Sequence, residues 1–224
     1  LLEKKNVVFA LVNYNSFGNI GWLRKLSLKN KRLKVIFGDL KDPDTFLDYL
    51  SKSDYVINLA SLISVPYSYS ASKSYLENNI LGCHFLYSSC KKLKIKKIIH
   101  ISSSEVYGTP KKLPITEHTI FNPQSPYAAS KAAADFVAKS YFYSFNLPII
   151  ILRPFNNFGP KQSLRAVIPT IIDQALKGSE IKLGKVSTKR DFLYVSDTVE
   201  AILKTIKINK DLFGEEISLG TNYT

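Results

Sequence analysis

Tyr127 and Lys131 are the two residues whose types and spacing point most directly to chemistry, because they stand four apart in "SPYAASKAAAD". The surrounding alanines predict a helix, and residues four apart on a helix project from the same face. A cation beside a phenol favours the phenolate and lowers its pKa. We therefore predict that Tyr127 exchanges a proton near neutral pH, with Lys131 as its neighbouring cation. Taken alone, the motif also fits an ordinary tyrosine on an alanine-rich helix.

A second group of polar side chains stands upstream in "IIHISSSEVYG", where an apolar run ends in three serines and a glutamate. Ligands of open α/β sheets bind at the carboxyl ends of the strands. If this strand and the Tyr127 helix are neighbours, Ser103 and Glu105 lie close to Tyr127. Further along, "RPFNNFGP" ends another apolar run, and "KRDFLYVSD" sets Arg190 beside Asp191, where a surface ion pair between the two is the simpler alternative.

The elements that would position these residues alternate along the chain. Short apolar runs predict strands at 6–12, 33–39, 55–60, 96–104, 147–156 and 215–221, and helical patterns fall at 42–52, 72–93, 123–145, 165–178 and 195–207. Most of the strand runs are continuously apolar, which is typical of strands covered on both faces. Strand–helix alternation predicts an α/β fold with a parallel sheet.

Five blocks, in this order, resemble the extended short-chain dehydrogenase/reductase superfamily, and within it the NAD-dependent nucleotide-sugar epimerase/dehydratase family. They are "FGDLKDPD", "INLAS", "ISSSEVYG", "SPYAASK" and "RPFNNFGP…RDFLYVSD". The resemblance covers essentially the whole chain and implies a Rossmann-like, doubly wound parallel sheet. It implies an NAD(P)-binding domain over 1–158 and a partial substrate-binding region over 159–224. "NYNSFGNIGW" and "SLISVPYSY" are most similar to bacterial 4,6-dehydratases of nucleotide-linked N-acetylglucosamine, of the legionaminic-acid-pathway type.

The glycines of "NYNSFGNIGW" raise the question of whether this loop cradles the cofactor's phosphates. The run "NVVFALV" before it is soon followed by "FGDL", which the family places after its third strand, so this run matches the second strand. By this resemblance Gly18 and Gly21 belong to the turn beside the adenosine ribose. The first strand, its glycine loop and part of the C-terminal domain are then absent. We accordingly expect the 224-residue piece alone to be inactive, a non-catalytic fragment.

The resemblance also implies roles for individual residues. The implied catalytic residues are Tyr127, Lys131, Ser103 and Glu105; the implied cofactor-binding residues are Asn13, Asp39, Leu59, Ala60, Ser61, Tyr127, Lys131 and Pro154; and the implied substrate-binding residues are Ser104, Asn156, Arg165 and Arg190. The implied cofactor is NAD. NADP stays open, because the ribose-side turn lacks a clear acidic residue and offers only Asn13.

The implied reaction is 4,6-dehydration of a nucleotide sugar, UDP- or GDP-N-acetylglucosamine, to a 4-keto-6-deoxy sugar through transient oxidation at the fourth carbon. Ser104 stands where many such dehydratases have an aspartate. The Ser104–Glu105 arrangement also resembles GDP-mannose dehydratases and UDP-glucuronate decarboxylases, so decarboxylation stays open. A 4-epimerase is the third alternative. It ranks below the other two because epimerisation would leave Glu105 without an obvious chemical role.

Composition limits the partners. The net charge is +13, but the charges are scattered, with "KKLKIKK" (91–97) as the dense run, so we expect no nucleic-acid partner. No apolar stretch is long enough to span a bilayer, and we expect no membrane partner. Cys83 and Cys90 lack metal-ligand or disulfide spacing, which predicts reduced thiols, a cytoplasmic location and no metal site. The resemblance further implies a homodimer formed through the helices at 72–93 and 123–145.

Overall fold

The computed structural model describes residues 1–178, 180–184, 187–208 and 210–222. The strands are β1 (Val8–Val12), β2 (Leu33–Phe37), β3 (Tyr55–Asn58), β4 (Lys97–Ile101), β5 (Ile149–Pro154), β6 (Asn156–Phe158), β7 (Phe192–Tyr194) and β8 (Glu216–Leu219). The α-helices are α1 (Leu23–Lys29), α2 (Leu47–Leu50), α3 (Val65–Ser70), α4 (Ser72–Tyr75), α5 (Gly82–Cys90), α6 (Pro126–Phe145), α7 (Val167–Lys177) and α8 (Val195–Lys207). A π-helical segment, η3 (Leu76–Leu81), joins α4 to α5, and 3₁₀ turns occur at Leu2–Lys4, Pro43–Thr45, Ser104–Tyr107 (η4) and Lys210–Leu212.

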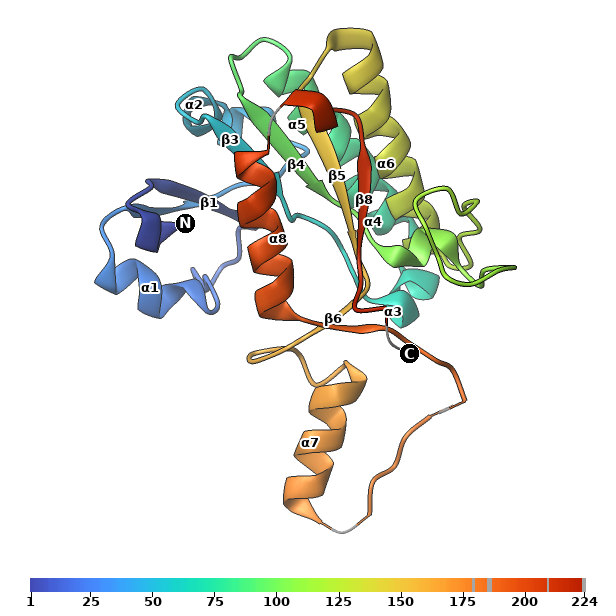
Figure 1. The fold of residues 1–224 in the computed structure, drawn as a ribbon. Helices are drawn as coiled ribbons and strands as arrows, with labels where there is room; N and C mark the ends of the chain where they lie inside the picture. The colour runs from blue at the N-terminus through green and yellow to red at the C-terminus, as the bar shows by residue number, and fades with distance from the viewer. Residues whose placement is uncertain (179, 185–186, 209, 223–224) are drawn as a thin grey trace.

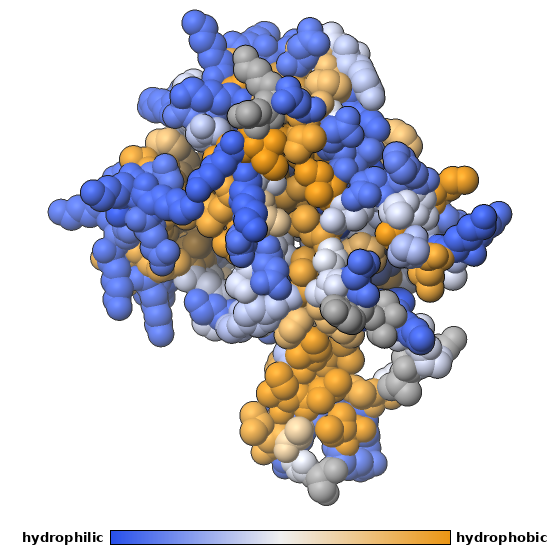
Figure 2. Space-filling model, viewed as in Figure 1, coloured by the Kyte–Doolittle hydropathy of each residue, from blue (hydrophilic) through white to orange (hydrophobic). Residues whose placement is uncertain are grey.

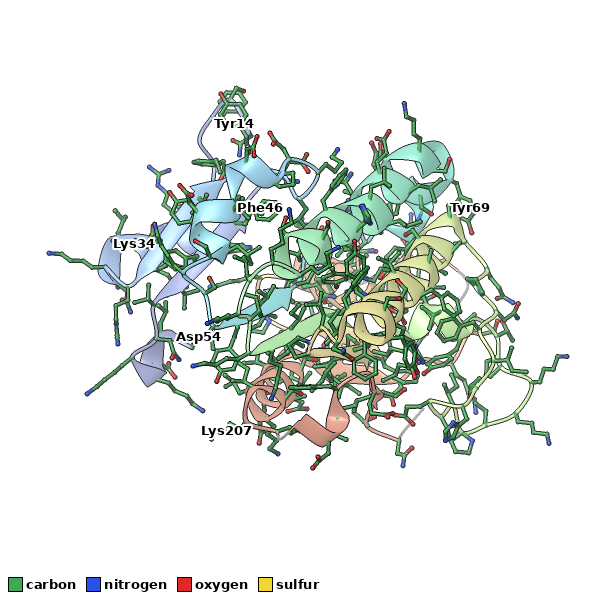
Figure 3. The ribbon with its side chains drawn as sticks, turned by 90° about the horizontal axis from the view of Figure 1, so that it is seen from above. Tyr14, Lys34, Phe46, Asp54, Tyr69 and Lys207 are labelled. Carbon is green, nitrogen blue, oxygen red and sulfur yellow. The ribbon has the colours of Figure 1, made fainter. Side chains whose placement is uncertain are left out.

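The strands form parallel sheets. The largest has the order β3–β4–β5–β8, while β1 pairs with β2 and β6 pairs with β7. The β1–β2 pair lies beside the β3 edge of the larger sheet (Figures 1 and 3). Among the described residues, no strand hydrogen-bonds to the second edge of β1 or to the outer edge of β3. Residues at the carboxyl ends of β1, β2 and β3 line one pocket, although no backbone ladder joins the β1–β2 pair to β3.

Helices cover both faces of the four-stranded sheet, with α5 and α6 on one side and α8 on the other (Figures 1 and 3). Side chains alternate between these faces along β4 and β5. Ile98, Ile149 and Ile151 pack with α5 and α6, whereas Ile99, Ile150 and Leu152 pack with α8. This two-sided burial explains why the strand sequences are continuously apolar. The predicted α/β class and doubly wound parallel arrangement are confirmed.

The predicted elements are present, with several differences in their bounds and some additional elements. All six predicted strands exist, and α8 has the predicted bounds. The predicted helix at 42–52 is instead divided into the 3₁₀ turn Pro43–Thr45 and the short α2, and the predicted helix at 72–93 is interrupted by η3. The short strands β6 and β7 and the helices α1 and α3 were not predicted, because three to seven residues give too little periodicity. The boundary at residue 158 stays a prediction, although α8 and β8 beyond it return to the main sheet.

The segment containing α7 extends away from the sheet (Figure 1), and Figure 2 shows an apolar surface over it. None of the α7 residues is buried, and Val167, Ile172 and Leu176 are exposed. Among the described residues, no helix has both the length and the apolar character needed to cross a membrane.

Candidate active site

Tyr127 and Lys131 lie in the first two turns of α6. The helix begins at Pro126, and the hydroxyl of Ser125 caps it by accepting a hydrogen bond from the Ala128 amide at 3.0 Å. Both side chains are buried, with Tyr127 only 7% and Lys131 only 4% exposed. The ring of Tyr127 meets that of Tyr75 edge-on, at 6.2 Å between centroids. The first two turns of α6 therefore hold the phenol of Tyr127 and the ammonium of Lys131 in buried positions.

The second group of predicted residues, Ser103 to Glu105, follows β4 and lies near the start of α6. Directly after it, the hydroxyl of Ser103 caps η4 by accepting a hydrogen bond from the Glu105 amide at 3.2 Å. Val106 and Tyr107 of η4 pack against Ala132 of α6, and the Ser103 hydroxyl and the charge of Glu105 both act on the pKa of Tyr127. Ser104 is buried within η4. The structure therefore brings Ser103, Glu105 and Tyr127 together, as the sequence predicted.

The predicted lowering of the Tyr127 pKa by Lys131 is wrong for this structure. Burial raises the pKa of Tyr127; the nearby Ser103 hydroxyl opposes this rise, while the charge of Glu105 adds to it. The Lys131 ammonium instead donates to the carbonyl oxygen of Ile101 on β4, at 2.6 Å. Burial also lowers the pKa of Lys131. The spacing correctly placed the two residues on one face but could not show where the ammonium donates its hydrogen bond.

A pocket of about 240 Å³ lies where the carboxyl ends of β1, β2 and β3 approach one another. Its lining includes five of the residues implied to bind the cofactor, which are Asn13, Asp39, Leu59, Ala60 and Ser61. Leu11, Leu40, Leu62 and Asn78 complete the wall and were not predicted. In the loop beside it, Gly18 and Gly21 have φ values of 58° and 55°, which favour glycine.

The remaining predicted residues lie at the carboxyl end of β5 or in the segments after it. Pro154 is buried as the last residue of β5, and the amide nitrogens of Asn156 donate to the backbone oxygen of Asp191. The exposed Arg165 acts electrostatically on Tyr75, which contacts Tyr127. These residues do not line the pocket of Asn13 and Asp39.

Arg190 is exposed and donates to the backbone oxygen of Lys189 at 3.0 Å. The alternative of an Arg190–Asp191 ion pair is not what the structure shows. The Asp191 carboxylate accepts hydrogen bonds from the amide and hydroxyl of Thr221 and from the Asn222 amide. Asp191 therefore ties the start of β7 to the segment after β8, and its carboxylate is occupied there.

Asn79 is a site residue that the sequence analysis missed. It is 1% exposed and lies in η3, a geometry often found at functional sites. Its amide group hydrogen-bonds both the N–H and the C=O of Leu62 in the pocket wall, and also donates to the Ser130 hydroxyl on α6. Asn79 thus fixes the pocket loop to the Tyr127 helix. A polar pair, "NN", inside an apolar helix was the available signal.

Comparison with known proteins decides the family. A family model described as GDP-mannose 4,6 dehydratase matches residues 1–222. The chain belongs to the nucleotide-sugar epimerase and dehydratase family of extended short-chain dehydrogenases/reductases. It is 34% identical, over 236 residues, to a dTDP-D-glucose 4,6-dehydratase of Dictyostelium discoideum, an alignment covering 99% of this chain and 53% of that protein. The chain therefore spans about half the length of that relative.

Solved structures of family members have the same fold. A dTDP-glucose 4,6-dehydratase of Streptomyces venezuelae, solved with NAD and TYD bound, superposes with a TM-score of 0.87 at 28% identity, covering 96% of this chain and 67% of that one. A UDP-N-acetylglucosamine 4-epimerase of Methanobrevibacter ruminantium, in complex with UDP-N-acetylmuramic acid, gives 0.87 at 35% identity, covering 97% and 70%. The family is thus represented among the matches by both dehydratases and epimerases.

Proposed function

We propose that this chain provides the catalytic residues and part of the cofactor site of an NAD-dependent nucleotide-sugar 4,6-dehydratase. The observation that carries the proposal is the meeting of Glu105 and Ser103 with the buried phenol of Tyr127. A phenol that exchanges a proton with a hydroxyl supports oxidation at the fourth carbon of a sugar. A carboxylate beside it supplies the second base that elimination across the fifth and sixth carbons requires.

The pocket at the ends of β1, β2 and β3 fits the nucleoside part of NAD. Its leucine and alanine side chains offer apolar walls for a flat base, and Asn13 and Asp39 offer an amide and a carboxylate for hydroxyl groups. Its position follows the rule for ligands of open α/β sheets. Leu59, Ala60 and Ser61 would continue this contact along the cofactor. NAD bound here supplies the acceptor for the hydride of the fourth carbon and later its donor to the sixth.

The residues of the chain move the protons. Tyr127, as phenolate, accepts the proton of the hydroxyl on the fourth carbon, while Ser103 hydrogen-bonds to that oxygen or to Tyr127. The Lys131 ammonium stabilises the phenolate electrostatically. Because burial raises the pKa of Tyr127, its activation in the working enzyme requires the positive charge of Lys131 to act on it more strongly than it does here.

Glu105 performs the second step. The ketone at the fourth carbon acidifies the C–H bond at the fifth, and Glu105 removes that proton. The proton that Glu105 took leaves with the hydroxyl of the sixth carbon as water. The proton that Tyr127 took is returned to the fifth carbon, and the cofactor would supply the hydride for the sixth. The net change is the loss of one water. Asn156 and Pro154 would border the sugar, Ser104 would support η4 beneath it, and the exposed Arg165 and Arg190 would pair with the diphosphate.

Oligomerisation belongs to the same proposal. We place a homodimer interface on η3 and α6, where Leu76, Leu81, Phe136 and Tyr143 are exposed apolar or aromatic side chains. Analytical ultracentrifugation of the intact protein and of Phe136→Glu tests this assignment: a dimer that the substitution converts to monomer supports it, and an unchanged mass contradicts it.

A 4-epimerase is the second candidate, favoured by the 35% identity to the UDP-N-acetylglucosamine 4-epimerase. We would incubate the intact protein and NAD with four substrates: UDP-N-acetylglucosamine, GDP-N-acetylglucosamine, dTDP-glucose and UDP-glucuronate. Product mass lower by one water establishes the dehydratase and identifies its sugar. Loss of carbon dioxide from UDP-glucuronate instead establishes a decarboxylase, and a product of unchanged mass but altered chromatographic retention establishes an epimerase.

A further inference from the structure

Asp191 is a buried carboxylate to which the proposed reaction gives no role. It directly precedes β7 and is 8% exposed. A carboxylate is costly to bury unless it is paired or hydrogen-bonded. Its partner is not the neighbouring Arg190, which donates to the backbone oxygen of Lys189 instead. The groups that do bind the Asp191 carboxylate therefore indicate its task.

Three neutral donors bind this carboxylate, and all belong to the segment after β8. Oδ2 of Asp191 accepts hydrogen bonds from the backbone amides of Thr221 at 2.8 Å and Asn222 at 3.3 Å, and Oδ1 accepts one from the Thr221 hydroxyl at 2.7 Å. Asn222 has a φ of 67°, a left-handed conformation in which asparagine is enriched. Successive amides that point to one anion form a concave anion site. The segment after β8 thus folds around the Asp191 carboxylate.

Gly220 permits the close approach of these groups. A Cβ at this position would lie 2.7 Å from Oδ2 of Asp191 and 3.2 Å from the ring of Phe155. The first distance is shorter than an ordinary van der Waals contact. The carboxylate, the end of β8 and Phe155 therefore fit together because residue 220 has no side chain.

The backbone of Asp191 continues the connection to Asn156. The carbonyl oxygen of Asp191 accepts hydrogen bonds from the backbone amide of Asn156 at 3.1 Å and from its side-chain Nδ2 at 3.4 Å. The preceding amide, that of Phe155, donates to the carbonyl oxygen of Leu219 at 2.9 Å. The turn from β5 into β6 is therefore bound to the end of β8 on one side and to Asp191 on the other.

The segments that Asp191 joins belong to two different sheets. β5 and β8 are part of the four-stranded sheet, whereas β6 and β7 form a separate pair. In the proposed reaction, Glu105 follows β4 of the larger sheet and Tyr127 lies on α6, while Asn156 is in β6 and Arg190 lies two residues before β7. The Asp191 carboxylate thus connects the substrate-binding residues to the sheet that carries the catalytic ones.

We propose that Asp191 is a positioning residue, whose carboxylate holds the Asn156 amide and the adjoining Arg190 in place for the substrate by binding the segment after β8. The proposal rests on the function proposed above for Asn156 and Arg190. Because the donors to the carboxylate are neutral, its role requires correctly placed acceptor atoms and no negative charge.

Steady-state kinetics of the intact protein, with the nucleotide sugar that reacts, test this role. Asp191→Ala removes all three contacts of the carboxylate. It should raise the KM for the sugar about tenfold, the size expected when one hydrogen-bonding side chain is misplaced. The kcat should change by less than about threefold, since binding of the ground state and of the transition state is weakened alike. NAD binding should stay unchanged, because Asp191 does not line the pocket of Asn13 and Asp39.

Asp191→Asn is the variant expected to rescue the KM. Its oxygen can accept from the amides of Thr221 and Asn222, while its NH₂ group can donate to the Thr221 hydroxyl oxygen. The KM should return to within about twofold of wild type, because the acceptor is restored without the charge. An Asp191→Asn variant as impaired as Asp191→Ala overturns the proposal.

Glu117→Ala is the matched control, because the Glu117 carboxylate also accepts a backbone amide of β8, that of Ser218 at 2.7 Å. It should leave the KM unchanged. Equal rises of the KM in Glu117→Ala and Asp191→Ala would indicate a general loosening of β8 and would contradict a specific role of Asp191.

Asp191→Ala leaves backbone amides without their acceptor, which can destabilise the fold. Gly220→Ala keeps the carboxylate but displaces it with a methyl group, and it should raise the KM in the same direction. A folded Gly220→Ala variant with the wild-type KM refutes the proposal.

Hydrogen exchange of the Asn156 backbone amide, followed by NMR, reports on the connection without any substrate. Exchange should accelerate in Asp191→Ala and stay slow in Asp191→Asn; equal exchange in wild type and Asp191→Ala overturns the proposal. If exchange accelerates as expected but none of the four nucleotide sugars reacts, the proposed function fails and the hold of Asp191 on Asn156 stands. If a sugar reacts and its KM is unchanged in Asp191→Ala, the positioning role fails and the function stands.

Discussion

Replacing Lys97 by methionine is expected to loosen the helix that covers one face of the main sheet. Lys97 is the first residue of β4 and is 4% exposed. Its ammonium group donates to three backbone oxygens at the end of α8, those of Thr205 at 2.8 Å, Ile206 at 3.0 Å and Ile208 at 2.5 Å. The last carbonyls of a helix have no partner within the helix, and a cation there also complements the helix dipole.

The magnitude follows from what methionine leaves behind. The bond to Thr205 is buried, and losing the partner of a buried acceptor costs about 1–3 kcal/mol. The bonds to Ile206 and Ile208 are only part-buried, so water replaces them at a lower cost. The loss of the dipole interaction adds about 0.3–1 kcal/mol. We therefore expect Lys97→Met to lower the free energy of unfolding by about 3 kcal/mol.

Urea denaturation of the intact protein measures this difference, with Lys204→Met as the control. Lys204 lies on the same helix but is exposed, and because its ion pair with Glu200 (2.9 Å) is exposed as well, losing that pair should change the free energy of unfolding little. If Lys97→Met costs no more than Lys204→Met, the reasoning from the helix end is refuted. A loss confined to the unfolding slope would also contradict it, because that indicates a change in the denatured ensemble.

Three further predictions concern the site. Tyr127→Phe should reduce the rate of product formation by about 10²–10⁴-fold. It should leave the unfolding midpoint close to wild type, because the contact with the Tyr75 ring needs no hydroxyl. A rate within threefold of wild type, ~0.6 kcal/mol in the activation barrier, would exclude Tyr127 as the base. Glu105→Gln should stop the loss of water but still permit oxidation at the fourth carbon, seen as reduced-nicotinamide absorbance on adding substrate, and normal water loss in this variant would move the second base elsewhere. Burial opposes a charge on His100, but bonding to Asp135 and Cys83 outweighs it and raises the pKa of His100. The stabilisation from His100 is then complete below its unfolded pKa of about 6.5 and is lost as pH rises through the folded value. His100→Gln should flatten the fall of unfolding free energy across that window, and an unchanged slope would show that another group titrates there.

Much of the fold can be predicted from local patterns in the sequence. Continuous apolar runs located the six strands, and the periodicity of 195–207 gave α8 with its bounds. The spacing of Tyr127 and Lys131 placed both on one face of α6, and the polar residues after β4 predicted the meeting with Ser103 and Glu105. These predictions succeeded because each depends on residues close in sequence or on the parallel alignment of strands, which brings their carboxyl ends to one edge.

Other properties depend on contacts between residues distant in sequence. The pKa of Tyr127 rises rather than falls because burial is the largest effect on it. The ammonium of Lys131 donates to the carbonyl of Ile101, a contact that residue spacing along the helix could not predict. Asn79 lies in the π-helical η3 and hydrogen-bonds Leu62 and Ser130, which are 17 and 51 residues away in the sequence. The Asp135 pair with Arg153 joins a helix to a strand 18 residues away. Local sequence patterns predict which chemical groups stand at the sheet edge. The charge states and hydrogen-bond partners of these groups depend on the packed fold, because desolvation and pairing arise only when separate elements come together.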